Sequence, residues 1–162
     1  MPSRKVVLVG HFGVGKTSLM RRFIDKAFSE DYKVTLGVQI KKKNLQSPEG
    51  KEISLIIWDI EGNTTVRKAR ESYLLGTNGF IYVFDATRSE TFVELNDEIA
   101  FLKEKYPGAS IKIVGNKEDL VNKESFKDTM RSQQIQCDFL TSAKTGKNVD
   151  KMFNDLAHEL LL

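Results

Sequence analysis

One stretch near the amino terminus constrains this chain more than any other part of it. Residues 10–17 read GHFGVGKT and directly follow an apolar run at residues 6–9. The two outer glycines, followed by Lys and Thr, match the phosphate-binding pattern G-x-x-x-x-G-K-S/T. Such glycines let the backbone turn its N–H groups inward around an anion, and a following helix adds the positive end of its dipole. The alternative, a glycine-rich turn that binds nothing, fits the position between a strand and a helix less well.

The pattern predicts a nucleoside polyphosphate. Lys16 would reach the terminal phosphates, and the hydroxyl of Thr17 would ligate Mg²⁺. The stretch alone does not identify the base of the nucleotide.

Length and charge narrow the class of protein. At 162 residues the chain is expected to form one domain spanning residues 1–162. Its net charge of +3 comes from interleaved charges, which argues against a nucleic-acid partner. Apolar runs stay below the roughly 18 residues that a membrane helix needs. The single cysteine, Cys137, suits a reducing compartment, so we expect a cytoplasmic protein. We also expect a monomer.

Apolar runs alternate with segments of helical periodicity along the chain. Short runs typical of buried parallel strands lie at residues 6–9, 53–58, 80–84 and 111–114. Helical spacing occurs at residues 18–28, 91–105 and 149–160, the last with Asn148 as a candidate N-cap. A turn at residues 47–50 joins residues 38–45 to 53–58 as a hairpin. This order predicts a three-layer α/β fold whose six-stranded sheet is mostly parallel, with one antiparallel edge strand.

Polar or glycine-bearing loops follow the predicted strands at residues 10–17, 59–62, 115–119 and 141–144. Ligands of such sheets bind beyond the carboxyl ends of the strands, so these loops should meet at one site. Their motifs, GxxxxGK(S/T), DxxG, NKxD and SAK, occur in the order and at the spacing of one family. Over essentially its whole length the chain resembles a Ras-superfamily small GTPase, closest to the Rab-like branch. The resemblance implies the P-loop NTPase fold.

The resemblance implies a guanine nucleotide, GTP or GDP. Asp119 would accept hydrogen bonds from N1–H and the 2-amino group of guanine, and adenine lacks both donors. Lys117 would lie along the base, Asn116 would tie its loop to residues 10–17, and the Ala143 N–H would meet the guanine oxygen. Phe28, which by itself reads as a core residue, lies where relatives stack an aromatic ring on the base.

The resemblance also implies a switch. Thr35 would ligate Mg²⁺ only in the triphosphate state, Asp59 would hold the metal through water, and Gly62 would donate its N–H to the γ-phosphate. The implied metal residues are Thr17, Thr35 and Asp59. The implied nucleotide residues are Gly13, Val14, Gly15, Lys16, Thr17, Ser18, Phe28, Tyr32, Thr35, Gly62, Asn116, Lys117, Asp119, Ser142, Ala143 and Lys144.

Three residues depart from the family pattern where hydrolysis should occur. The implied catalytic residues are Lys16, Gly62 and Asn63, but relatives carry Gln at the position of Asn63, where it orients the attacking water. Asn is one methylene shorter, which displaces its amide. Glu61 brings a negative charge that should oppose the triphosphate unless it points outward or pairs with a cation. Phe12 stands where relatives carry a small residue, and its ring should obstruct an arginine supplied by a partner.

These departures predict slow GTP hydrolysis. The alternative is a pseudo-GTPase scaffold that holds guanine nucleotide with negligible turnover. A P-loop small-molecule kinase shares residues 10–17 but does not explain residues 116–119 and 142–144.

The resemblance implies effector, exchange-factor and activating partners that bind residues 29–45 and 60–75. The lysines at residues 41–43 would either protect an edge strand or receive an acidic effector. Rab-like relatives continue into a tail with prenylated cysteines, whereas this sequence ends in leucines at residues 160–162. We therefore expect that membrane association is not encoded in this chain.

Overall fold

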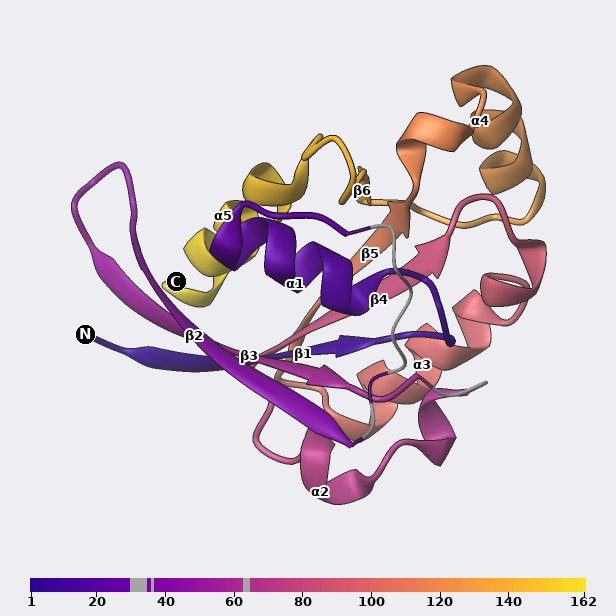
Figure 1. Ribbon diagram of the computed structural model, residues 1–162. Coiled ribbons are helices and arrows are strands. Elements are labelled where there is room, and N and C mark those ends of the chain that lie inside the picture. Colours follow the sequence, from indigo (N-terminus) through magenta and orange to yellow (C-terminus); the bar gives the residue numbers. More distant parts are fainter. Residues whose placement is uncertain (30–34, 36, 63–64) are drawn as a thin grey trace.

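A six-stranded sheet organises the computed structural model, which describes residues 1–29, 35, 37–62 and 65–162 (Figure 1). The strands are β1 (Ser3–Val9), β2 (Val38–Gln46), β3 (Glu52–Ile60), β4 (Gly79–Asp85), β5 (Ser110–Asn116) and β6 (Phe139–Leu140). Their order across the sheet is β2-β3-β1-β4-β5-β6. β2 pairs antiparallel with β3, and the other pairings are parallel. The predicted fold class is therefore confirmed.

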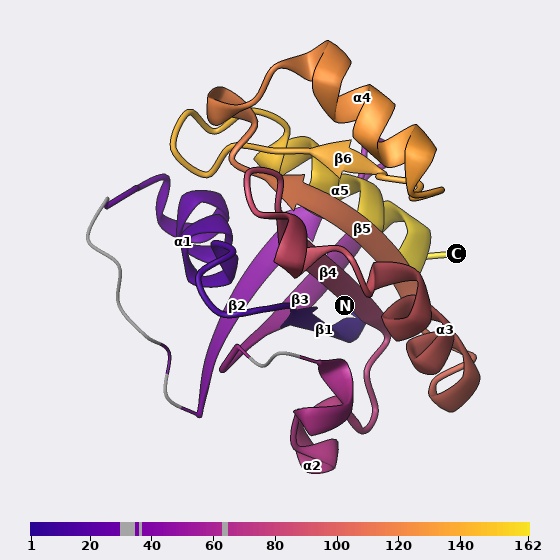
Figure 2. The same cartoon turned by 90° about the vertical axis from the view of Figure 1, so that its right-hand side faces the viewer.

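Helices cover both faces of the sheet (Figure 2). The α-helices are α1 (Lys16–Asp25), α2 (Glu71–Leu74), α3 (Leu95–Lys105), α4 (Lys123–Ser132) and α5 (Val149–Leu160). Short 3-10 helices are η1 (Val66–Lys68), η2 (Ser89–Thr91) and η3 (Glu118–Leu120). α1 and α5 pack on one face, and α3 and α4 contribute to the core on the other.

The strands bury side chains on both faces. In β1, Val6 and Leu8 join the core under α1 and α5, whereas Val7 and Val9 join the core under α3 and α4. Successive side chains of a strand point to opposite faces, so a sheet covered on both sides requires continuous apolar runs. This explains why the predicted parallel strands read as unbroken apolar segments.

The predicted hairpin is present at the sheet edge. The backbone N–H of Ser47 donates to the Lys51 carbonyl at 2.7 Å, and the N–H of Gly50 donates to the Ser47 carbonyl at 2.9 Å. The turn brings Gln46 opposite Glu52 in the antiparallel register. β2 is mostly exposed, as expected of an edge strand.

Two predicted helix boundaries and one predicted capping contact were wrong. α1 ends at Asp25, because Lys26 adopts φ 54° and its N–H donates to the Arg22 carbonyl, so Phe28 lies beyond the helix. The predicted helix 91–105 divides into η2 and α3. Asn148 precedes α5 but its side chain does not cap the helix; it donates to the Leu140 carbonyl at 3.0 Å.

Within the described residues, no helix is both long enough and apolar enough to cross a membrane.

A stacked pair of aromatic rings joins the two helices of one face, and it generates a stability prediction. Phe23 of α1 and Phe153 of α5 lie with ring centroids 4.2 Å apart, and both side chains are almost fully buried. Phe153→Ala is expected to lower the free energy of unfolding by about 3–5 kcal/mol because it leaves a cavity between the helices.

Chemical denaturation measures this loss. The control is Val93→Ala, since Val93 is exposed and should change the free energy by about 0.5 kcal/mol or less. Equal effects of the two substitutions would contradict the predicted contribution of the stacked pair.

Candidate functional site

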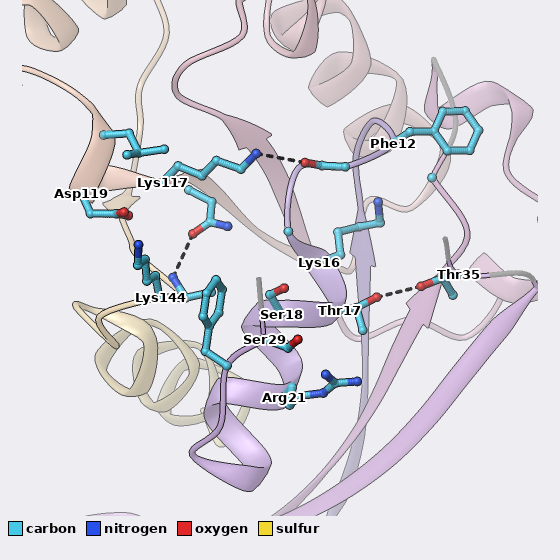
Figure 3. Close-up of a pocket in the computed structure, with 17 residues that line it drawn as sticks. Phe12, Lys16, Thr17, Ser18, Arg21, Ser29, Thr35, Lys117, Asp119 and Lys144 are labelled. Carbon is cyan, nitrogen blue, oxygen red and sulfur yellow. Dashed lines mark hydrogen bonds between the residues drawn. The ribbon is translucent and has the colours of Figure 1, made fainter. Parts of the chain in front are cut away.

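A cavity of about 330 Å³ lies at the carboxyl ends of the parallel strands (Figure 3). It is lined by Phe12, Gly13, Gly15, Lys16, Thr17, Ser18, Arg21, Phe28, Ser29, Thr35, Gly62, Asn116, Lys117, Asp119, Leu120, Ala143 and Lys144. Most of the described residues implied for nucleotide binding therefore meet in one cavity. Val14 and Ser142 are fully buried behind it. Tyr32 and Asn63 lie outside the described residues.

Several carbonyl groups of residues 10–17, the phosphate loop, accept hydrogen bonds from lysine side chains. Lys16 Nζ donates to the carbonyls of Gly10 at 3.3 Å and His11 at 3.0 Å. Lys117 Nζ donates to the Gly13 carbonyl at 3.3 Å. In a planar trans peptide the N–H points opposite to the C=O, so a carbonyl held by a donor also fixes the direction of the next N–H. A run of N–H groups fixed in this way can form a nest for an anion.

Lys16 carries the clearest electrostatic sign that the cavity is built for an anion. The residue is buried, and burial lowers the pKa of its ammonium group to about 8, with the charge of Asp59 partly opposing the shift. A bound anion would favour the charged form of Lys16 and raise this pKa.

Asn116 ties the phosphate loop to the loops that follow β5 and β6. Its Nδ2 donates to the Val14 carbonyl at 3.0 Å, which matches the tie implied by the family resemblance. Its Oδ1 accepts from the Ala143 N–H and from Thr141 Oγ1, each at 3.2 Å. A Cβ atom on Gly15 would lie 2.2 Å from this Nδ2, so only glycine permits the approach.

Ala143 and Asp119 both have hydrogen-bond partners within the protein. The Ala143 N–H already donates to Asn116, so a guanine oxygen would have to share or replace that bond. Asp119 is exposed and accepts a hydrogen bond from Ser142 Oγ at 2.7 Å. Leaving the Asp119 carboxylate without further hydrogen-bond donors would therefore cost free energy only when a bound base covers it.

Two further residues contact these loops, and the spacing of the sequence motifs did not predict them. Arg22 of α1 donates to the carbonyls of Ala143 at 2.7 Å and Lys144 at 2.5 Å. Asp85, at the end of β4, is fully buried, and its Oδ2 lies 2.6 Å from Lys117 Nζ. The ion pair holds the Lys117 side chain over the phosphate loop.

Three oxygen-bearing side chains converge beside Lys16. Thr17 Oγ1 lies 2.7 Å from Thr35 Oγ1 and donates to Asp59 Oδ2 at 2.5 Å. Asp59 is fully buried, and its Oδ1 has no hydrogen-bond partner among the described residues. Burial raises the pKa of Asp59, and the Thr17 hydrogen bond and Lys16 oppose that shift. Oxygen ligands and an unsatisfied carboxylate oxygen suit a hard divalent cation.

The segment after β3 packs directly on the phosphate loop. A Cβ atom on Gly62 would lie 2.8 Å from Phe12 Cα, so glycine is required for this contact. Glu61 contacts the backbone on the other side of the site: its Oε2 accepts from the Gly37 N–H at 3.5 Å. The Glu61 N–H in turn donates to the Gly37 carbonyl at 2.8 Å. These bonds join residue 37 to the segment after β3.

Phe12 lies at the rim of the cavity. Its side chain is 47% exposed, and Figure 3 shows the ring projecting outward from the phosphate loop. The ring therefore lies at the edge of the cavity that Gly62 and Lys16 also line.

Comparison with known proteins agrees with this geometry. The family model described as "Ras family" matches residues 5–162. Ras-related protein Rab-13 of Mesocricetus auratus is 35% identical over 164 residues, which cover 98% of this chain and 80% of the relative. Rab-13 of Canis lupus familiaris shows the same identity and coverage. The chain therefore belongs to the Ras family, as a Rab-like small GTPase of the Ras superfamily.

Proposed function

We propose that residues 1–162 form one G domain, a cytoplasmic switch that binds GDP or GTP with Mg²⁺ and hydrolyses GTP slowly. One observation carries the proposal: a single cavity is lined on one side by the phosphate loop and on the other by Asn116, Lys117, Asp119 and Ala143. A polyphosphate would lie in the nest of N–H groups, and a base would lie between Phe28 and the loop after β5.

The metal would be held by Thr17, Thr35 and Asp59. The buried Oδ1 of Asp59, without a partner among the described residues, supports this assignment. A bound Mg²⁺ would neutralise charge on the phosphates. The contribution of the protein is to hold the two hydroxyls and the carboxylate together, with Thr17 on α1 and Asp59 on β3 as fixed points.

Thr35 and Gly62 would make the site a switch. Each lies in one of the two segments, residues 29–45 and 60–75, through which we expect effector, exchange-factor and activating proteins to bind. Both residues line the cavity, so loss of a terminal phosphate would remove a contact from each segment. The Glu61–Gly37 hydrogen bonds make the two segments move together.

We expect slow GTP hydrolysis because of three residues in the same region. Asn63 replaces the water-orienting Gln of relatives, Glu61 is engaged with Gly37, and Phe12 borders the entrance. The alternative, a scaffold that holds nucleotide without turnover, rests on the same three residues. Chromatographic identification of the bound nucleotide, combined with Mg²⁺-dependent hydrolysis over hours, distinguishes the two functions.

The first prediction about the site concerns the base. Asp119→Ala is expected to weaken GDP binding by about 10- to 100-fold, because a charged acceptor for guanine is lost. Competition against a fluorescent guanine nucleotide measures the change. Asp128→Ala on α4 is the matched control, since Asp128 is an exposed carboxylate, and it should leave binding unchanged. ATP competing as well as GTP for the unmodified protein would contradict guanine selectivity.

The second prediction concerns the metal. Asp59→Asn keeps the size of the side chain but removes its charge, and it should raise the Mg²⁺ concentration needed to retain nucleotide by about tenfold or more. Titration of Mg²⁺ against the rate of nucleotide release measures this. Asp25→Asn, at the exposed end of α1, is the control and should not change the titration. Retention of nucleotide that is independent of Mg²⁺ in the unmodified protein would rule out the metal site.

The third prediction concerns hydrolysis. Asn63→Gln should speed single-turnover GTP hydrolysis by roughly 10- to 100-fold, because a longer side chain can align the attacking water. The exposed surface substitution Asn96→Gln should leave the rate unchanged. If Asn63→Gln also leaves it unchanged, residue 63 does not limit the reaction, and if hydrolysis stays undetectable in both, the scaffold alternative gains support.

A further inference from the structure

We propose that Arg88 positions the phosphate loop for the terminal phosphates of the nucleotide. The residue belongs to none of the motifs that identify the family, and it does not line the cavity. Its guanidinium group acts from behind the loop, on the carbonyl side. The inference rests on the proposed function, because it concerns the same nucleotide.

Arg88 follows β4 and reaches the phosphate loop across more than 70 positions of sequence. Its Nη1 donates to the Phe12 carbonyl at 3.2 Å and to the Gly13 carbonyl at 3.4 Å. These are the carbonyls at the outer end of the loop, beyond those that Lys16 holds. Arg88 therefore extends the set of donors along the outer side of the loop.

The geometry of the peptide bond links these contacts to the direction of the N–H groups in the loop. The Phe12 carbonyl and the Gly13 N–H belong to one planar trans peptide and point in opposite directions, as do the Gly13 carbonyl and the Val14 N–H. When Arg88 holds the two carbonyls outward, the N–H groups of Gly13 and Val14 face the cavity. Gly13 has φ 70°, a conformation that fixed carbonyls help to maintain.

A buried carboxylate fixes Arg88 itself. Asp85 Oδ2 lies 3.7 Å from Arg88 Nη1 and 2.6 Å from Lys117 Nζ. Lys117 also donates to the Gly13 carbonyl, at 3.3 Å. Asp85 thus holds two cations, one from each neighbouring loop, that meet at the same carbonyl. Glu90 receives the Arg88 Nε hydrogen bond at 3.1 Å and limits the rotation of the guanidinium plane.

Arg88 affects the phosphate loop through its charge as well as through its hydrogen bonds. Burial, together with the charges of Arg88 and Lys16, holds the pKa of His11 below its usual value. Arg88, Lys16 and Lys117 bring positive charge to the loop. That field favours a ligand with several negative charges.

The simpler interpretation is an ordinary surface ion pair between Arg88 and Glu90. The Glu90 side chain is 65% exposed, and exposed ion pairs contribute little to stability. That interpretation gives Arg88 no effect on bound nucleotide. It does not account for the bonds to Phe12 and Gly13, and the two interpretations differ in a measurable way.

The test uses the whole protein loaded with GDP and Mg²⁺. Arg88→Gln keeps a polar donor but shortens the side chain and removes the charge and the forked geometry. We expect GDP release to be about tenfold faster, because hydrogen bonds from a charged donor are lost. We also expect the phosphorus NMR resonances of bound GDP to shift, because the N–H groups of Gly13 and Val14 change direction. Arg88→Lys keeps the charge and should fall between the unmodified protein and Arg88→Gln.

Arg131→Gln is the matched control, since Arg131 forms an exposed ion pair on α4, and it should change neither quantity. Thermal unfolding of the loaded proteins checks that Arg88→Gln remains folded. GDP release and phosphorus resonances that match the unmodified protein would overturn the role of Arg88 while leaving the proposed function intact. Failure of the unmodified protein to bind any guanine nucleotide would instead refute the proposed function.

Discussion

The side chain of Asn116 is the constraint on which the site depends. It is almost fully buried, and its amide makes bonds in two directions: Nδ2 to Val14 of the phosphate loop, and Oδ1 to Thr141 and Ala143 after β6. Each group of a primary amide thus has a protein partner, and no apolar or charged side chain could replace both. The approach also requires glycine at position 15. One buried amide therefore fixes the distance between the place for phosphates and the place for a base.

A second constraint is electrostatic, because several charges of the site are balanced only in part by the protein. Burial lowers the pKa of Lys16 and raises that of Asp59, so each side chain is held in a place that disfavours its charged form. The two charges attract each other across the site, yet the Asp59 Oδ1 atom has no partner among the described residues. An anion beside Lys16 and a cation beside Asp59 would stabilise the charged forms of both side chains. The proposed pair of polyphosphate and Mg²⁺ meets that requirement.

Sequence patterns predicted the sheet and the loops that meet at its edge, because apolar runs and motif spacing are local signals. They did not predict where α1 ends, because the left-handed conformation of Lys26 depends on its tertiary surroundings. α4 was missed, although Asn122 accepts the Ser125 N–H as an N-cap and was a readable signal. Arg22, Asp85 and Arg88 were also missed, since they act through contacts between segments distant in sequence. The roles of all the predicted site residues stay predictions, and Tyr32 and Asn63 also lie outside the described residues.

Two of the three departures from the family pattern, Phe12 and Glu61, lie in segments that contact each other. The Phe12 backbone contacts Gly62 on one side and accepts from Arg88 on the other. Glu61, next to Gly62, is bonded to Gly37, which precedes β2. A change at any of these positions would therefore alter the fit between the phosphate loop and the segment that follows β3. In the proposed switch, the rate of hydrolysis would depend on that fit as well as on the length of residue 63. The substitution Asn63→Gln would then restore only the part of the hydrolysis rate that depends on orienting the attacking water.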